Sequence, residues 1–145
     1  MRAVLLLPLV LALTAPLGVG QRRKMKRLPK QTKQSALAHG TWGGLHLRME
    51  VTDKGARLEY DCAHGSINQK IVVDAGGHFE VGGVYVPERG GPIRQDQETS
   101  EQPVVYIGTV RGQSMTVRVK FAGEDEEGET FTLTHGSEGQ LMKCR

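Results

Sequence analysis

Apolar and polar residues alternate along most of the chain after residue 40, and short glycine-containing turns interrupt this alternation. In the longest alternating stretch, residues 114–121, every second side chain from Met115 to Phe121 is apolar. A period of two places alternate side chains on opposite faces of a strand, so one face of each strand is buried. We therefore predict an all-β fold of about eight short antiparallel strands, arranged as a small barrel or a sandwich.

The same pattern predicts a hairpin from residues 45–52 and 57–62, joined by the turn Asp53-Lys54-Gly55. The remaining strands are expected at residues 71–73, 78–81, 84–86, 104–110, 130–134 and 140–144. The pair Gly82-Gly83 is interpreted as a tight turn or a bulge, and Arg111-Gly112 as a turn. Residues 87–103 form the longest irregular stretch, which we expect to be a surface loop.

The first twenty residues have the order of a secretory signal peptide. A short basic start is followed by a long apolar run, and Gly18-Val19-Gly20 supplies small residues before Gln21. We predict cleavage there, export to the periplasm or the medium, and no integral membrane segment after signal removal. The alternative is a signal-anchor, since basic residues directly follow the apolar run and such residues tend to stay in the cytoplasm.

The positive charge of the chain is concentrated in one segment. Residues 21–33 contain seven basic and no acidic residues, whereas residues 34–145 contain 11 basic and 16 acidic residues, a net charge of −5. We predict a disordered basic arm over residues 21–39 and a single domain over residues 40–145. A lysine- and arginine-rich arm can bind anionic partners, and its first candidates are Arg22, Arg23, Lys24, Lys26 and Arg27. The arm has no aromatic residues, so we expect no specific nucleic-acid binding.

Cys62 and Cys144 are the only cysteines. In an exported protein an even number of cysteines indicates disulfide bonding. A Cys62–Cys144 bridge would clip the C-terminus onto an early strand. Two buried free thiols are the alternative.

Four side chains are candidates for metal ligation, because imidazole and carboxylate groups suit zinc or copper. They are His46, Asp61, His64 and His78. Their spacing matches no known metal motif, and hydrogen-bonded surface and turn residues are the simpler interpretation, so we predict no cofactor. Cys62 and His64 could suggest a nucleophile pair, but a disulfide would consume the thiol. No serine lies in a Gly-x-Ser-x-Gly context, and we predict that the protein is not an enzyme.

Several motifs resemble those of a family of small secreted bacterial proteins of unknown function. They are Trp42-Gly43-Gly44-x-His46, Asp61-Cys62-Ala63-His64-Gly65, Gly90-Gly91-Pro92, Tyr106-x-Gly108-x-Val110-x-Gly112-x-x-Met115-Thr116, Phe131-x-Leu133 and Lys143-Cys144. This resemblance implies export and an all-β fold, and it implies no activity. Gly40-Thr41-Trp42 is also similar to the Gly-x-Trp opening of lipocalin-like barrels, which is an analogy of shape only.

These observations predict a non-catalytic domain that binds an envelope component or a secreted protein. The candidate contact surfaces are the basic arm and a loop that contains Glu88, Arg89, Gly90, Gly91 and Arg94. The alternatives are a small-ligand carrier with an unfilled barrel, an inhibitor of a secreted protease, and a metal-binding domain or enzyme. We expect Trp42 to plug one end of the barrel rather than to line a ligand site.

Overall fold

The computed structural model describes residues 33–88, 100–123 and 128–144, and every regular element within them is a β-strand. The strands are β1 (Ser35–Ala36), β2 (Gly40–Gly44), β3 (Leu47–Val51), β4 (Ala56–Tyr60), β5 (Ala63–Ile67), β6 (Val72–Val73), β7 (His78–Pro87), β8 (Gln102–Arg111), β9 (Ser114–Phe121) and β10 (Thr130–His135). The prediction of an all-β fold is confirmed.

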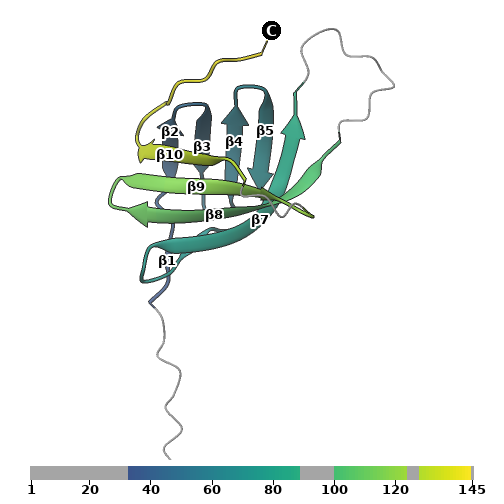
Figure 1. Ribbon diagram of the computed structural model, residues 1–145. Coiled ribbons are helices and arrows are strands. Elements are labelled where there is room, and N and C mark those ends of the chain that lie inside the picture. The colour runs from purple at the N-terminus through teal and green to yellow at the C-terminus, as the bar shows by residue number, and fades with distance from the viewer. Residues whose placement is uncertain (1–32, 89–99, 124–127, 145) are drawn as a thin grey trace, which may run out of the picture. The chain divides into compact units, whose positions relative to one another are not determined.

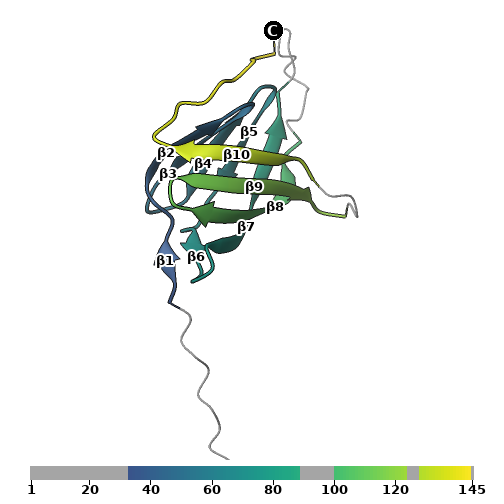
Figure 2. The ribbon, with the colours of Figure 1, turned by 60° about the vertical axis from the view of Figure 1, so that its left-hand side comes forward.

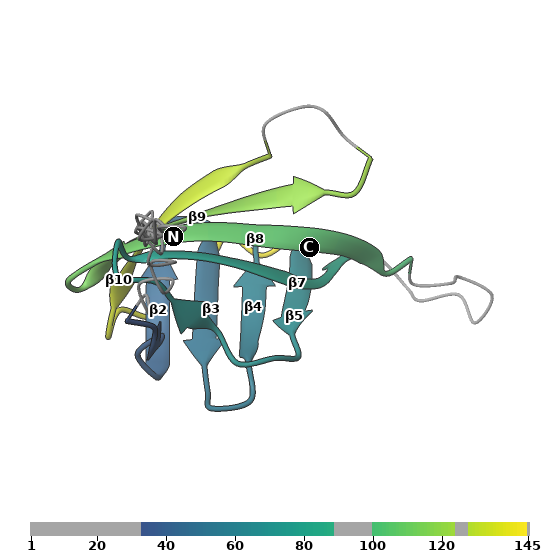
Figure 3. The ribbon, with the colours of Figure 1, turned by 90° about the horizontal axis from the view of Figure 1, so that it is seen from below.

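Eight of these strands form one closed antiparallel barrel in the order β10-β2-β3-β4-β5-β7-β8-β9. Strands β2 to β5 stand side by side, and β8, β9 and β10 cross them (Figure 1). From below, β2 to β5 form a row and β8 passes over them (Figure 3). The barrel closes where β10 pairs with β2, from Leu133 opposite Gly44 to His135 opposite Trp42. Of the two predicted architectures, the structure is therefore the barrel and not the sandwich.

The barrel interior is filled by the apolar row of each strand. Tyr106 is fully buried, and its ring reaches from β8 across to β5 and β7. Two glycines make room for it: a Cβ on Gly65 would lie 2.5 Å from the Tyr106 hydroxyl, and one on Gly83 would lie 2.6 Å from its ring. Gly83 thus belongs to the middle of a continuous strand. Gly82-Gly83 is not the predicted turn, and its unbroken register with β8 shows that it is not a bulge in that pairing either.

One end of the barrel is closed by residues outside the eight strands. There β1 pairs with β6, and Leu37, Ile71 and Val73 are buried (Figure 2). Trp42 is 1% exposed and its indole N–H donates to the carbonyl of Ala38 at 3.0 Å, which confirms that it is a buried plug. We call this the sealed end.

Two predictions about local structure are corrected. Residues 35–39 are not part of a disordered arm, because strand pairing, the burial of Leu37 and the Trp42 hydrogen bond hold them on the barrel. Residues 140–144 do not form a last strand. The barrel is already closed by β10, so this segment makes only a single bridge, from Gln140 to Leu45.

Candidate functional site

After β10 the chain turns back and runs along the outside of the barrel as a strap, which we define as residues 136–144 (Figure 2). The strap passes over β2, where Gln140 N–H donates to Gly44 O at 2.8 Å and His46 N–H donates to Gln140 O at 2.8 Å. It ends at the disulfide between Cys144 and Cys62, whose Cα atoms are 5.2 Å apart. The predicted bridge is confirmed, and it fastens the C-terminus to the connection between β4 and β5.

Asp61 is the main polar attachment point of the strap. One carboxylate oxygen accepts the N–H of Met142 at 2.7 Å, the other accepts from His46 Nδ1 at 2.6 Å, and the Asp61 carbonyl accepts the N–H of Cys144 at 3.2 Å. The backbone hydrogen bond from Met142 and then the bond from His46 lower the pKa of this carboxyl. His46 reaches Asp61 from a left-handed backbone conformation, with φ of 67°, which is uncommon for a residue other than glycine.

A line of alternating charges also ties the strap to the barrel wall. Arg48 on β3 contacts both Glu138 of the strap, at 3.1 Å, and Glu59 on β4. Lys143 of the strap lies 3.0 Å from Glu59 and 3.8 Å from Glu88. The hydrogen bond from Lys143 is the largest cause that lowers the pKa of Glu59, and Arg48 adds to it. These side chains are partly exposed, so each pair contributes little to stability by itself.

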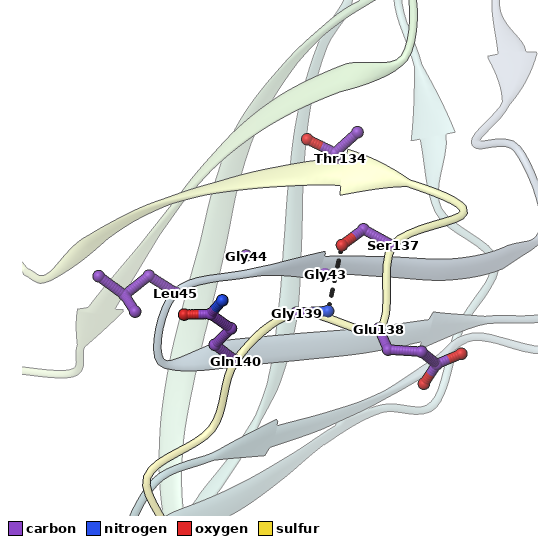
Figure 4. Close-up of a pocket in the computed structure, with 8 residues that line it drawn as sticks. All are labelled: Gly43, Gly44, Leu45, Thr134, Ser137, Glu138, Gly139 and Gln140. Atoms are coloured by element: carbon purple, nitrogen blue, oxygen red, sulfur yellow. Dashed lines mark hydrogen bonds between the residues drawn. The ribbon is translucent and has the colours of Figure 1, made fainter.

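A shallow pocket of about 400 Å³ lies between the strap and the barrel. Gly43 and Gly44 of β2, Leu45, Thr134 of β10 and residues 137–140 line it (Figure 4). Its polar groups bond mostly within the protein: the Ser137 hydroxyl accepts the N–H of Gly139 at 3.2 Å. The pocket is therefore the seam along which the strap is seated.

The structure brings together only one pair of the candidate metal ligands. His46 and Asp61 are in contact, but His64 instead pairs with Glu88 at 2.9 Å. His78 starts β7 at the sealed end, where its Nδ1 lies 3.0 Å from the Thr109 hydroxyl. Within the described ranges no three His, Cys, Asp or Glu side chains are close enough to hold one metal ion. Because Cys62 is in the disulfide, it has no free thiol that could act as a nucleophile with His64.

Four aromatic rings form a continuous cluster at the other end of the barrel, which we call the aromatic end. The ring centroid of Tyr60 lies 5.6 Å from that of Phe131 and 5.2 Å from that of Tyr85. The Tyr85 centroid in turn lies 5.1 Å from that of Phe121, and all three contacts are edge-to-face. Tyr60 and Phe131 are each 6% exposed, whereas Tyr85 and Phe121 are half-buried. The rings come from β4, β7, β9 and β10, so the cluster spans the interior.

Two tyrosines of this cluster have raised pKa values. Burial is the largest cause for both Tyr60 and Tyr85, and the negative charge of Glu129 adds to it for each. The Tyr60 hydroxyl also lies 3.5 Å from that of Tyr106, which donates to Val84 O at 3.2 Å. The tyrosines at this end therefore remain neutral hydrogen-bonding groups at physiological pH.

Sequence reasoning did not identify the aromatic end. The signal was present for three of the four rings, which occupy the last or first inward position of a strand: Tyr60 ends β4, Phe121 ends β9, and Phe131 is the second residue of β10. Of the predicted loop, Glu88 is described, and it is exposed and pairs with His64. The other predicted contact residues lie outside the described ranges; they are Arg89, Gly90, Gly91 and Arg94 of the loop and Arg22, Arg23, Lys24, Lys26 and Arg27 of the arm.

The chain was compared with known proteins, and no relative was found. No family model, no curated protein and no solved structure matches the chain. The resemblance to a secreted bacterial family thus stays a prediction. No helix among the residues described is long and apolar enough to cross a membrane.

Proposed function

We propose that this protein is an exported, non-catalytic binding domain that contacts a partner through the aromatic end of its barrel. One observation carries this proposal: Tyr85 and Phe121 pack against the core yet remain partly exposed, whereas the opposite end is covered by Leu37, Ile71 and Val73. Partly exposed aromatic rings are characteristic of binding surfaces, because they offer large contact area at little cost in side-chain entropy.

The filled interior favours this proposal over a small-ligand carrier. A carrier of lipocalin-like shape needs space between its walls, but here the Tyr106 ring lies against the backbone of Gly65 and Gly83. At the aromatic end, the buried rings of Tyr60 and Phe131 pack against each other, and Tyr60 packs against Tyr85.

The polar side chains that could carry chemistry are instead engaged with one another. Cys62 is in the disulfide, Asp61 bonds His46 and the strap, and His64 pairs with Glu88. These contacts support a structural role for the residues considered as metal ligands or nucleophiles.

Binding at the aromatic end can be tested with a panel of short blocked peptides that carry a central leucine, phenylalanine, lysine, arginine or glutamate. In amide NMR spectra at millimolar peptide, we expect shifts around Tyr85 and Phe121 and none around Trp42, at the sealed end. Tyr85→Leu and Phe121→Leu keep apolar volume but remove a ring, and each should weaken binding by about three- to tenfold.

The matched control is Phe79→Leu, which removes a buried ring near the sealed end and should leave peptide binding unchanged. Fluorescence of Trp42, the only tryptophan of the chain, reports whether each variant is folded. If no peptide of the panel shifts the aromatic end, the proposed function is wrong.

Export is part of the proposal, and it is supported by the signal-like first twenty residues together with the disulfide, which is typical of oxidising compartments. Intact mass spectrometry of protein recovered from its own host should give a chain that starts at Gln21 and gains two hydrogens on reduction. A chain that retains residues 1–20 and has free thiols would contradict export.

A further inference from the structure

A single carboxylate accompanies the aromatic cluster. Glu129 lies two residues before Phe131, and its carbonyl accepts the N–H of Val119 at 3.0 Å, so the ladder between β9 and β10 continues to this residue. Side chains two residues apart on an extended chain point to the same side. Glu129 is therefore placed in the inward-facing row of Phe131, at the rim of the aromatic end.

Glu129 carries an exposed carboxylate. None of the ion pairs described above, which involve Arg48, Lys143, His46 and His64, includes it. Its negative charge also adds to the rise in the pKa of Tyr60 and Tyr85, in agreement with its place in the row of Phe131. A carboxylate in the same inward-facing row as aromatic rings is a combination that attracts a cation, because ring faces are also electronegative.

The filled interior at the aromatic end bears on whether the cation belongs to a small ligand or to a larger partner. A small ligand needs most of its surface enclosed, but the buried rings of Tyr60 and Phe131 pack next to the half-buried Tyr85. Because these rings pack against one another, we infer that a ligand at this end contacts mainly the rim. A side chain that belongs to a larger partner satisfies this condition.

We propose that the aromatic end receives a lysine or arginine side chain of a partner protein, held by the rings of Tyr85 and Phe121 and by the Glu129 carboxylate. This inference rests on the proposed function and names the chemistry of the partner. The cationic head lies beside Glu129, and the aliphatic stem of the side chain packs on the rings, as such stems do on apolar surfaces.

The test uses the folded protein and the same peptide panel, with affinities measured by NMR titration at low and high salt. Lysine and arginine peptides should bind more tightly than the leucine peptide, and the glutamate peptide most weakly. Glu129→Gln should weaken the basic peptides by about two- to fivefold and leave the leucine peptide unchanged. High salt should reduce the advantage of the basic peptides in the same way.

The matched control is Glu80→Gln, which removes an equal charge from an exposed position of β7 and should have no effect. If leucine and lysine peptides bind equally well and Glu129→Gln changes neither, the cationic partner is excluded while binding at the aromatic end stands. If no peptide binds, both proposals are wrong. A free alkylammonium that binds as tightly as the lysine peptide would overturn the choice of a protein partner.

Discussion

Replacing Cys62 and Cys144 together by serine is expected to lower the free energy of unfolding by about 4 kcal/mol, because the bridge closes a very long loop in the unfolded chain. The two cysteines are 82 positions apart. For a domain of this size the loss corresponds to a fall in Tm of roughly 15 °C. Denaturant unfolding followed by Trp42 fluorescence measures the change.

The unmutated protein under reducing conditions provides the control, and its stability should match that of the double serine variant. The folded barrel of the variant should still form, because β10 pairs with β2 without help from the strap. A loss below about 1 kcal/mol would show that loop closure does not stabilise this fold as the chain-entropy model requires.

Gly43→Ala is expected to destabilise the protein by about 2–3 kcal/mol, within the range seen for overpacked sites. A Cβ on Gly43 would lie 2.3 Å from both Gly139 N and Ser137 O. These are backbone atoms of the strap, so no side-chain rotation relieves the clash and the strap itself must move. The same denaturant unfolding experiment measures the effect.

Gly82→Ala is the matched control, since a Cβ at Gly82 has no atom within 4 Å, and its effect should stay within about 0.5 kcal/mol. The contact between Gly43 and the strap predicts a second result. In the background that lacks Cys62 and Cys144 the strap is free to shift, so Gly43→Ala should cost less there. Additive effects of the two changes would contradict contact between β2 and the strap as the source of the loss.

Alternation predicted those strands that have one clearly apolar face. Strand β9 has the predicted bounds, Ser114–Phe121, and the hairpin of β3 and β4 turns at the predicted residues. Pattern analysis missed β5, Ala63–Ile67, because Ala63 and Gly65 are small. Gly65 is small for a reason outside the strand: the Tyr106 hydroxyl, which reaches across from β8, occupies the space where its Cβ would lie.

The candidate site could be predicted only in part, for a similar reason. Of the four candidate metal ligands, His46 and Asp61 are in contact, and the predicted disulfide was confirmed. However, Tyr60, Tyr85 and Phe121 lie far apart in the chain, and only barrel closure brings their strand ends together. Glu129 joins them through the pairing of β9 with β10, which no local pattern specifies.

The described chain begins at Lys33, beside the sealed end, and its strap finishes at Cys144, close to Tyr60. An attachment made through the N-terminal side therefore meets the barrel at the face that carries Trp42 and leaves Tyr85 and Phe121 pointing away from the support. An attachment at the end of the strap would instead lie on the side where Lys143 contacts the Tyr60 carbonyl. Immobilisation for partner capture, and any display of this domain on a surface, should accordingly be built from the N-terminal side.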